Sequence, residues 1–157
     1  MGYSYDIRLE RRFANQIKAA LGCLFIGQDP QHDVQQGTDF EIFTITPFRV
    51  AARLRRHCYL ARYKNEFTIR WTRPSGVLTE IDKIRSGFVD YLFYGFVDKQ
   101  EKRLVQYFVG DLRLFRAKEP KPIGIFPNDP FDSELAAYAL SDMPRRFLLK
   151  TWKKPEG

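Results

Sequence analysis

The stretch from Glu66 to Asp98, EFTIRWTRPSGVLTEIDKIRSGFVDYLFYGFVD, carries the strongest structural signal in the chain. Its first part predicts a strand, because Phe67, Ile69 and Trp71 alternate with polar residues and so share one face. A Pro-Ser-Gly turn, a short helix and a second strand follow. This order indicates an α/β domain, in which the turn joining a strand to a helix commonly holds functional side chains.

The helix in this stretch has clear end signals. Thr79 is the predicted N-cap, with Asp82 as the third residue after it, and the helix is expected to end near Gly87. The segment that follows, at residues 91–97, is almost entirely apolar. We therefore expect a strand that is buried on both faces.

The remaining segments complete the predicted fold. We expect an amphipathic helix at 7–21 that stops at Gly22, a short strand at 23–26, a pair of strands around Pro47, a strand at 104–115, a helix at 133–142 and a basic strand or arm at the end. The prediction is one domain over residues 1–157, with a core at 7–116, a Pro-rich loop at 117–130, and a C-terminal helix and basic arm at 131–157. The fold class is α/β, with a single mixed β-sheet flanked by helices.

Composition limits the functional classes. The chain has 26 Lys and Arg residues against 19 Asp and Glu, a net charge of +7, which favours polyanionic partners. The two cysteines, Cys23 and Cys58, lie far apart and form no CxxC pair, and with only two histidines the chain is not expected to form a Cys/His zinc site. No apolar run reaches the roughly 18 residues of a membrane span, so we expect no membrane partner and a cytoplasmic location. No GxGxxG or GxxxxGK[ST] loop indicates a dinucleotide or P-loop site.

The basic residues gather on the predicted strands. Alternation along 48–56 places Arg53 and Arg55 on one face, with Arg56 beside them, while Arg70 and Arg73 follow on the strand that begins at Glu66. We expect these five arginines to contact the phosphates of a nucleic acid, with DNA as the expected partner. The alternative for any such run is a solvated face.

The predicted elements follow one another as helix, two or three strands, a strand with acidic and basic groups, helix and buried strand. This order resembles the αβββαβ core of the PD-(D/E)xK nuclease superfamily, which includes Holliday-junction resolvases and restriction endonucleases. The stretches GTDFEI, RVAARLRR, EFTIRWTRPSG, TEIDKI and DYLFYGF are also similar to uncharacterised proteins of phages and bacteria, over roughly residues 30 to 116. This second resemblance implies no established activity.

The superfamily resemblance implies a catalytic site. Asp39 and Glu66 would hold Mg²⁺, Lys83 would lie near the attacking water, and Glu10 could add an oxygen. The sequence departs from the family pattern, because Ala51-Ala52-Arg53 stands where an acid and a lysine are expected. Asp39, Glu66 and Lys83 could instead be ordinary turn, strand and helix residues, with Lys83 paired to Glu80.

Two functions follow from these observations. The first is a nuclease-like DNA-binding protein, a possible homodimer, that hydrolyses phosphodiesters with Mg²⁺. The alternative is a non-catalytic binding module of the same fold that grips nucleic acid or a host protein, for example as a phage inhibitor of a defence system.

Overall fold

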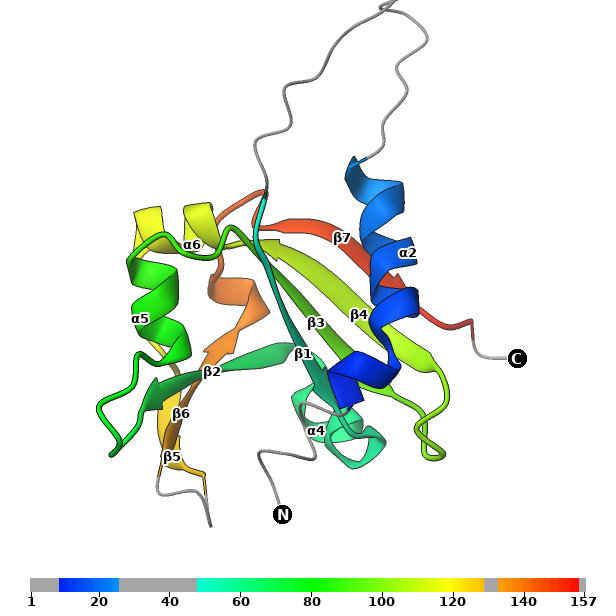
Figure 1. Ribbon diagram of the computed structural model, residues 1–157, viewed down its shortest axis with the longest axis horizontal. Coiled ribbons are helices and arrows are strands. Elements are labelled where there is room, and N and C mark those ends of the chain that lie inside the picture. The colour runs from blue at the N-terminus through cyan, green and yellow to red at the C-terminus, as the bar shows by residue number, and fades with distance from the viewer. Residues whose placement is uncertain (1–8, 26–47, 129–132, 156–157) are drawn as a thin grey trace, which may run out of the picture.

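The computed structural model describes residues 9–25, 48–128 and 133–155, and its strands form two sheets (Figure 1). The helices are α2 (Ala14–Phe25), α4 (Leu60–Tyr63), α5 (Glu80–Arg85) and α6 (Leu112–Lys118). The strands are β1 (Val50–Arg55), β2 (Glu66–Thr72), β3 (Tyr91–Val97), β4 (Leu104–Asp111), β5 (Gly124–Pro127), β6 (Glu134–Ala139) and β7 (Leu148–Lys153). The predicted strand before Pro47 and the hairpin there lie outside the described residues.

The α/β class is confirmed, but the predicted single sheet is wrong for the described strands. One sheet has the order β1-β3-β4-β7, with β1 parallel to β3 and the other neighbours antiparallel. The second sheet has the order β2-β6-β5 and is antiparallel. Strand β2 does not join the first sheet, because its backbone pairs with residues 134–139 instead.

Strand β3 is buried on both faces, as predicted, and therefore separates two halves of the core. On one face, Phe93 packs with the helical segment of residues 9–25. On the other face, Tyr94 and Phe96 pack against the second sheet and against α5 and α6. The molecule thus has helix α2 over one side of the four-stranded sheet and the three-stranded sheet with two short helices over the other (Figure 1).

Helix α5 begins where the sequence predicts. The Thr79 hydroxyl accepts a hydrogen bond from the Asp82 amide, and the Asp82 carboxylate accepts one from the Thr79 amide at 2.9 Å, which completes a capping box. Gly87 follows the helix with φ of +75°, a left-handed conformation that glycine adopts at little cost.

Four segment predictions are wrong. The first helix continues through Gly22 to Phe25, so the described residues of the strand expected at 23–26 are helical. The strand that begins at Leu104 ends at Asp111, where the Asp111 carboxylate accepts the Arg113 amide and starts α6. The expected C-terminal helix at 133–142 is mostly strand β6, and the Pro-rich loop at 117–130 contains strand β5.

The C-terminal basic segment and the length of the helices complete the description of the fold. The basic segment near the C-terminus does form a strand, β7. No helix in the described segments combines the length and apolar character needed to cross a bilayer.

Candidate functional site

Arg53 lies on the inner face of β1 and is mostly buried. Its neighbour Ala51 packs against the core between the two sheets, which confirms that both residues share a face. The Arg53 guanidinium donates to the Glu80 carboxylate at 2.5 Å, and only 16% of its side-chain surface is exposed. The positive charge of Arg53 is therefore neutralised by Glu80 within the protein.

Glu80 joins β1, β2 and α5 at one point. One carboxylate oxygen accepts the Arg53 guanidinium, and the other accepts the backbone amide of Arg70 at 2.8 Å. Burial works against the charge, but the two donors outweigh it and hold the pKa of Glu80 below its usual range. We call Arg53, Arg70 and Glu80 the arginine–glutamate cluster. The alternative pairing of Glu80 with Lys83, suggested by their spacing, is not the ion pair that the structure contains.

A second group lies just beyond the end of β1, where the chain turns outward. The Arg55 guanidinium sits over the Tyr59 ring at 4.4 Å from its centroid, and the Arg62 guanidinium sits over the Tyr63 ring at 5.2 Å. The two rings are themselves 6.2 Å apart, at an angle of 38°. We call Arg55, Tyr59, Arg62 and Tyr63 the basic–aromatic cluster.

Part of the basic–aromatic cluster faces solvent, while Arg55 and Tyr63 are half-buried. Tyr59 is 40% exposed, and Arg62 is also exposed. Both belong to a short helical excursion, a 3-10 turn at His57–Tyr59 followed by α4, in which no residue is fully buried and Leu60 packs against the core. Each guanidinium lies close enough to a ring for a cation–π attraction, so the four side chains hold one another in place.

Sequence reasoning found only part of the basic–aromatic cluster. Arg55 was predicted to contact nucleic acid, whereas Tyr59 and Tyr63 were not singled out. Their spacing of four residues is the signal that could have identified them, because residues four apart lie on the same side of a helical turn.

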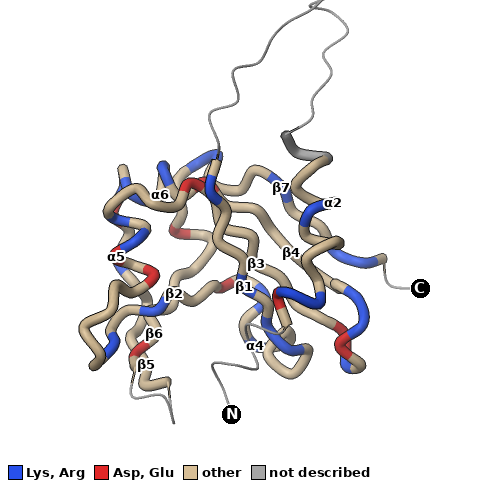
Figure 2. Tube along the Cα trace, in the orientation of Figure 1, with Lys and Arg blue, Asp and Glu red and all other residues tan. Residues whose placement is uncertain are grey.

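Arg56 lies beside the basic–aromatic cluster. Its Nε is 3.3 Å from a Glu101 carboxylate oxygen, and Arg12 from the N-terminal helical segment reaches the other oxygen at 3.2 Å. Figure 2 shows basic positions gathered around α4 and the nearby start of that segment. Arg73, the fifth predicted phosphate contact, is half-buried just after β2, so the five arginines are divided among different surroundings.

The predicted catalytic residues are only partly described. Asp39 lies outside the described residues. Glu66 is half-buried at the start of β2, and Lys83 is exposed on α5. These two described side chains do not form an ion pair with each other. Glu10, the possible extra ligand, accepts the Leu54 amide at the edge of β1 at 3.1 Å.

A metal site needs several His, Cys, Asp or Glu side chains close together. Within residues 9–25, 48–128 and 133–155, no three His, Cys, Asp or Glu side chains come together as a possible metal site. Of the two predicted magnesium ligands, Asp39 and Glu66, Glu66 alone lies in the part of the chain that the structure describes.

The chain was also compared with known proteins. No protein-family model, curated protein or solved structure matches it.

Proposed function

We propose that the protein binds nucleic acid, DNA in the first instance, through the basic–aromatic cluster. The observation that carries this proposal is the pair of tyrosine rings, 6.2 Å apart, each with an arginine over it, on a solvent-facing turn. The exposed Tyr59 ring and the half-buried Tyr63 ring offer a stacking surface for unpaired bases, while the arginines attract phosphates. The net charge of +7 adds a long-range attraction for the same partner.

The proposed role is that of a non-catalytic binding module, acting in the cytoplasm of a bacterial cell or a phage-infected host. Two features support binding over hydrolysis. Arg53 stands where the family pattern expects a lysine, and its charge is neutralised by Glu80. A host protein is the alternative partner for the same surface.

The first prediction concerns affinity. Arg55→Ala/Arg62→Ala should weaken binding to a labelled single-stranded DNA about tenfold or more and lower the slope of log affinity against log salt by about 0.7 for each lost phosphate contact. Fluorescence anisotropy at several salt concentrations measures both quantities. Parallel titrations with duplex DNA and with RNA of the same sequence identify the type of nucleic acid that binds most tightly.

A matched control separates local contacts from net charge. Arg145→Ala/Lys121→Ala removes the same two charges from exposed residues outside the basic–aromatic cluster. Tyr59→Leu/Tyr63→Leu keeps apolar side chains but removes the stacking rings, and it should also weaken single-strand binding about tenfold, since stacking contributes about 1–3 kcal/mol per base. Equal losses in the control and in the arginine variant would contradict the proposal.

Hydrolysis remains a separate prediction of the family resemblance. Incubation of plasmid, linear and branched DNA with Mg²⁺ tests it. If cleavage occurs, Asp39→Ala and Glu66→Ala should each abolish it while leaving DNA binding intact, because the two carboxylates would hold the metal. Cleavage that survives either substitution removes that residue from the catalytic site.

A further inference from the structure

A pocket of 380 Å³ lies where β2, α5, α6 and the segment after α6 meet, beside the core between the two sheets. Its lining includes Trp71, Ile81, Arg85, Phe115, Glu119 and Tyr138. Three of these side chains are aromatic, and the volume falls within the range of small-molecule sites. None of its residues belongs to the basic–aromatic cluster.

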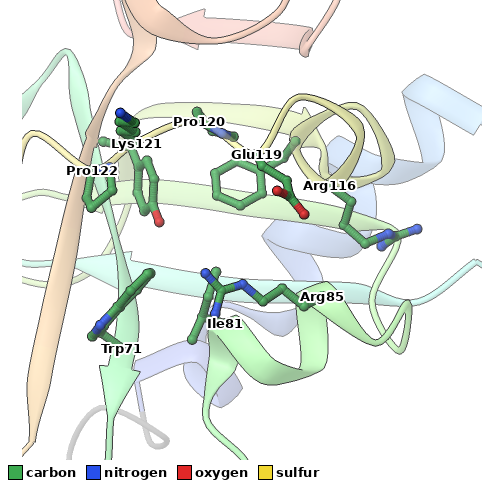
Figure 3. A pocket seen from close by; sticks show the side chains of 10 residues that line it. Trp71, Ile81, Arg85, Arg116, Glu119, Pro120, Lys121 and Pro122 are labelled. Atoms are coloured by element: carbon green, nitrogen blue, oxygen red, sulfur yellow. The ribbon is translucent and has the colours of Figure 1, made fainter.

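Only two charged groups face the interior of this pocket. Figure 3 shows Arg85 reaching in from one wall and Glu119 from the opposite wall, whereas Lys121 and Arg116 direct their charged ends away. Arg116 is engaged elsewhere, because its guanidinium donates to the carbonyl oxygens of Ile84 and Val89, the latter at 2.9 Å. The pocket therefore offers one donor group and one acceptor group, on opposing sides.

Arg85 is held in place by an aromatic neighbour. Its guanidinium lies 5.0 Å from the centroid of the Trp71 ring. The positive charge of Arg85 also acts on Tyr138. Burial raises the pKa of the Tyr138 hydroxyl, and Arg85 opposes this rise. Among the described residues, Arg85 and Glu119 form no ion pair with each other or with another side chain, so both can engage a ligand.

Glu119 occupies a backbone position that disfavours it. It ends α6 with φ of 47° and ψ of 60°, and its amide donates to the Phe115 carbonyl. Glycine is the usual residue in this left-handed position after a helix, since a Cβ atom is strained there. A strained residue at the wall of a pocket is a reason to look for a role of its side chain.

We propose that this pocket binds a guanine ring. Guanine presents N–H donors on one edge, which suit the Glu119 carboxylate, and the O6 and N7 acceptors on another edge, which suit an arginine such as Arg85. Its flat faces suit the aromatic lining. Adenine presents an acceptor nitrogen where guanine has the N1 donor. A free amino acid carries both charges on one carbon, whereas Arg85 and Glu119 project from opposite walls.

Intrinsic fluorescence can report on the pocket directly. The chain has two tryptophans, and Trp152 stacks on Tyr107 at 5.5 Å, away from the pocket lining. In a Trp152→Phe background, the remaining emission comes from Trp71. Titration with guanosine monophosphate should change it saturably, adenosine monophosphate should bind at least tenfold more weakly, and inorganic phosphate should have no effect.

Oligonucleotides show whether the pocket binds guanine in a free nucleotide or guanine within a nucleic-acid strand. A thymine hexamer with one central guanine is compared with an all-thymine hexamer in the same background. A response to the guanine hexamer alone, without one to the mononucleotide, identifies a base within a strand. A response to neither guanine ligand overturns the proposal, as does an equal response to the adenine or phosphate ligand.

Variants test the assignment of the two charged groups. Glu119→Gly should raise the midpoint of thermal unfolding, because glycine relieves the left-handed backbone, yet weaken guanine binding at least tenfold. Arg85→Gln should weaken it similarly, and Lys121→Ala, a neighbour that points outward, should bind like the parent. Unchanged binding in Glu119→Gly overturns the assignment. This result is independent of the basic–aromatic cluster, since Arg55→Ala/Arg62→Ala should leave the Trp71 response intact.

Discussion

Replacing Phe67 by Ala is expected to lower the free energy of unfolding by about 3–5 kcal/mol, because the substitution opens a cavity between the two sheets. Phe67 has no exposed surface. Its ring lies within 6.3 Å, centroid to centroid, of five aromatic rings, those of Tyr94, Phe108, Phe115, Tyr138 and Phe147. Urea denaturation followed by circular dichroism measures the loss.

Phe88 provides the matched control for Phe67. It is 49% exposed, so Phe88→Ala removes a ring of the same size without opening a cavity in the core. This substitution should change the free energy of unfolding by no more than about 0.5–1 kcal/mol. Similar losses in the two variants would show that Phe67 does not hold the sheets together.

Glu80→Ala should lower the free energy of unfolding by about 2 kcal/mol at pH 7, because it leaves the Arg53 charge largely buried without its partner. Loss of one member of a buried pair costs about 3–5 kcal/mol. The expected value here is smaller, since 41% of the Glu80 side chain is exposed to solvent. Arg53→Met/Glu80→Leu, which removes both charges, should recover much of the loss.

The contribution of Glu80 should also depend on pH. Its pKa is lowered in the folded protein, so its stabilising effect is present above the unfolded value of about 4.3 and is lost as the pH falls through the folded value. The difference in stability between the parent and Glu80→Gln should therefore shrink below about pH 4. Lys83→Ala serves as the control, because Lys83 is exposed on the same helix, and a difference of similar size in that variant would argue against the Arg53–Glu80 pair.

Local patterns predicted the elements whose signals are local. The capping residues of α5 and the continuous apolar run of β3 both identify their structures without reference to the rest of the chain. Strand β6 was mistaken for a helix because its sequence, ELAAYA, is rich in helix formers. Its strand structure depends on pairing with β2, where Phe67 lies opposite Tyr138, 71 positions further along.

The same distinction applies to the candidate sites. Alternation along β1 placed Arg53 and Arg55 on one face correctly, but it could not separate their environments. Arg53 meets Glu80, 27 residues away, whereas Arg55 meets Tyr59 on the adjacent turn. The choice of a partner distant in sequence is a property of the assembled sheets, and no periodicity within one strand encodes it.

The strand order of the two sheets has a consequence for biosynthesis. Residues 134–153 provide β6, which is the central strand of one sheet, and β7, which closes an edge of the other. While the ribosome is still adding these residues, β2 has no neighbour in its sheet and β4 has an open edge, with apolar side chains nearby. Unpaired edges of this kind attract other chains. The three-stranded sheet can therefore not be completed before residue 139 has been made, nor the four-stranded sheet before residue 153, and until then the unpaired strands are open to contact with other chains.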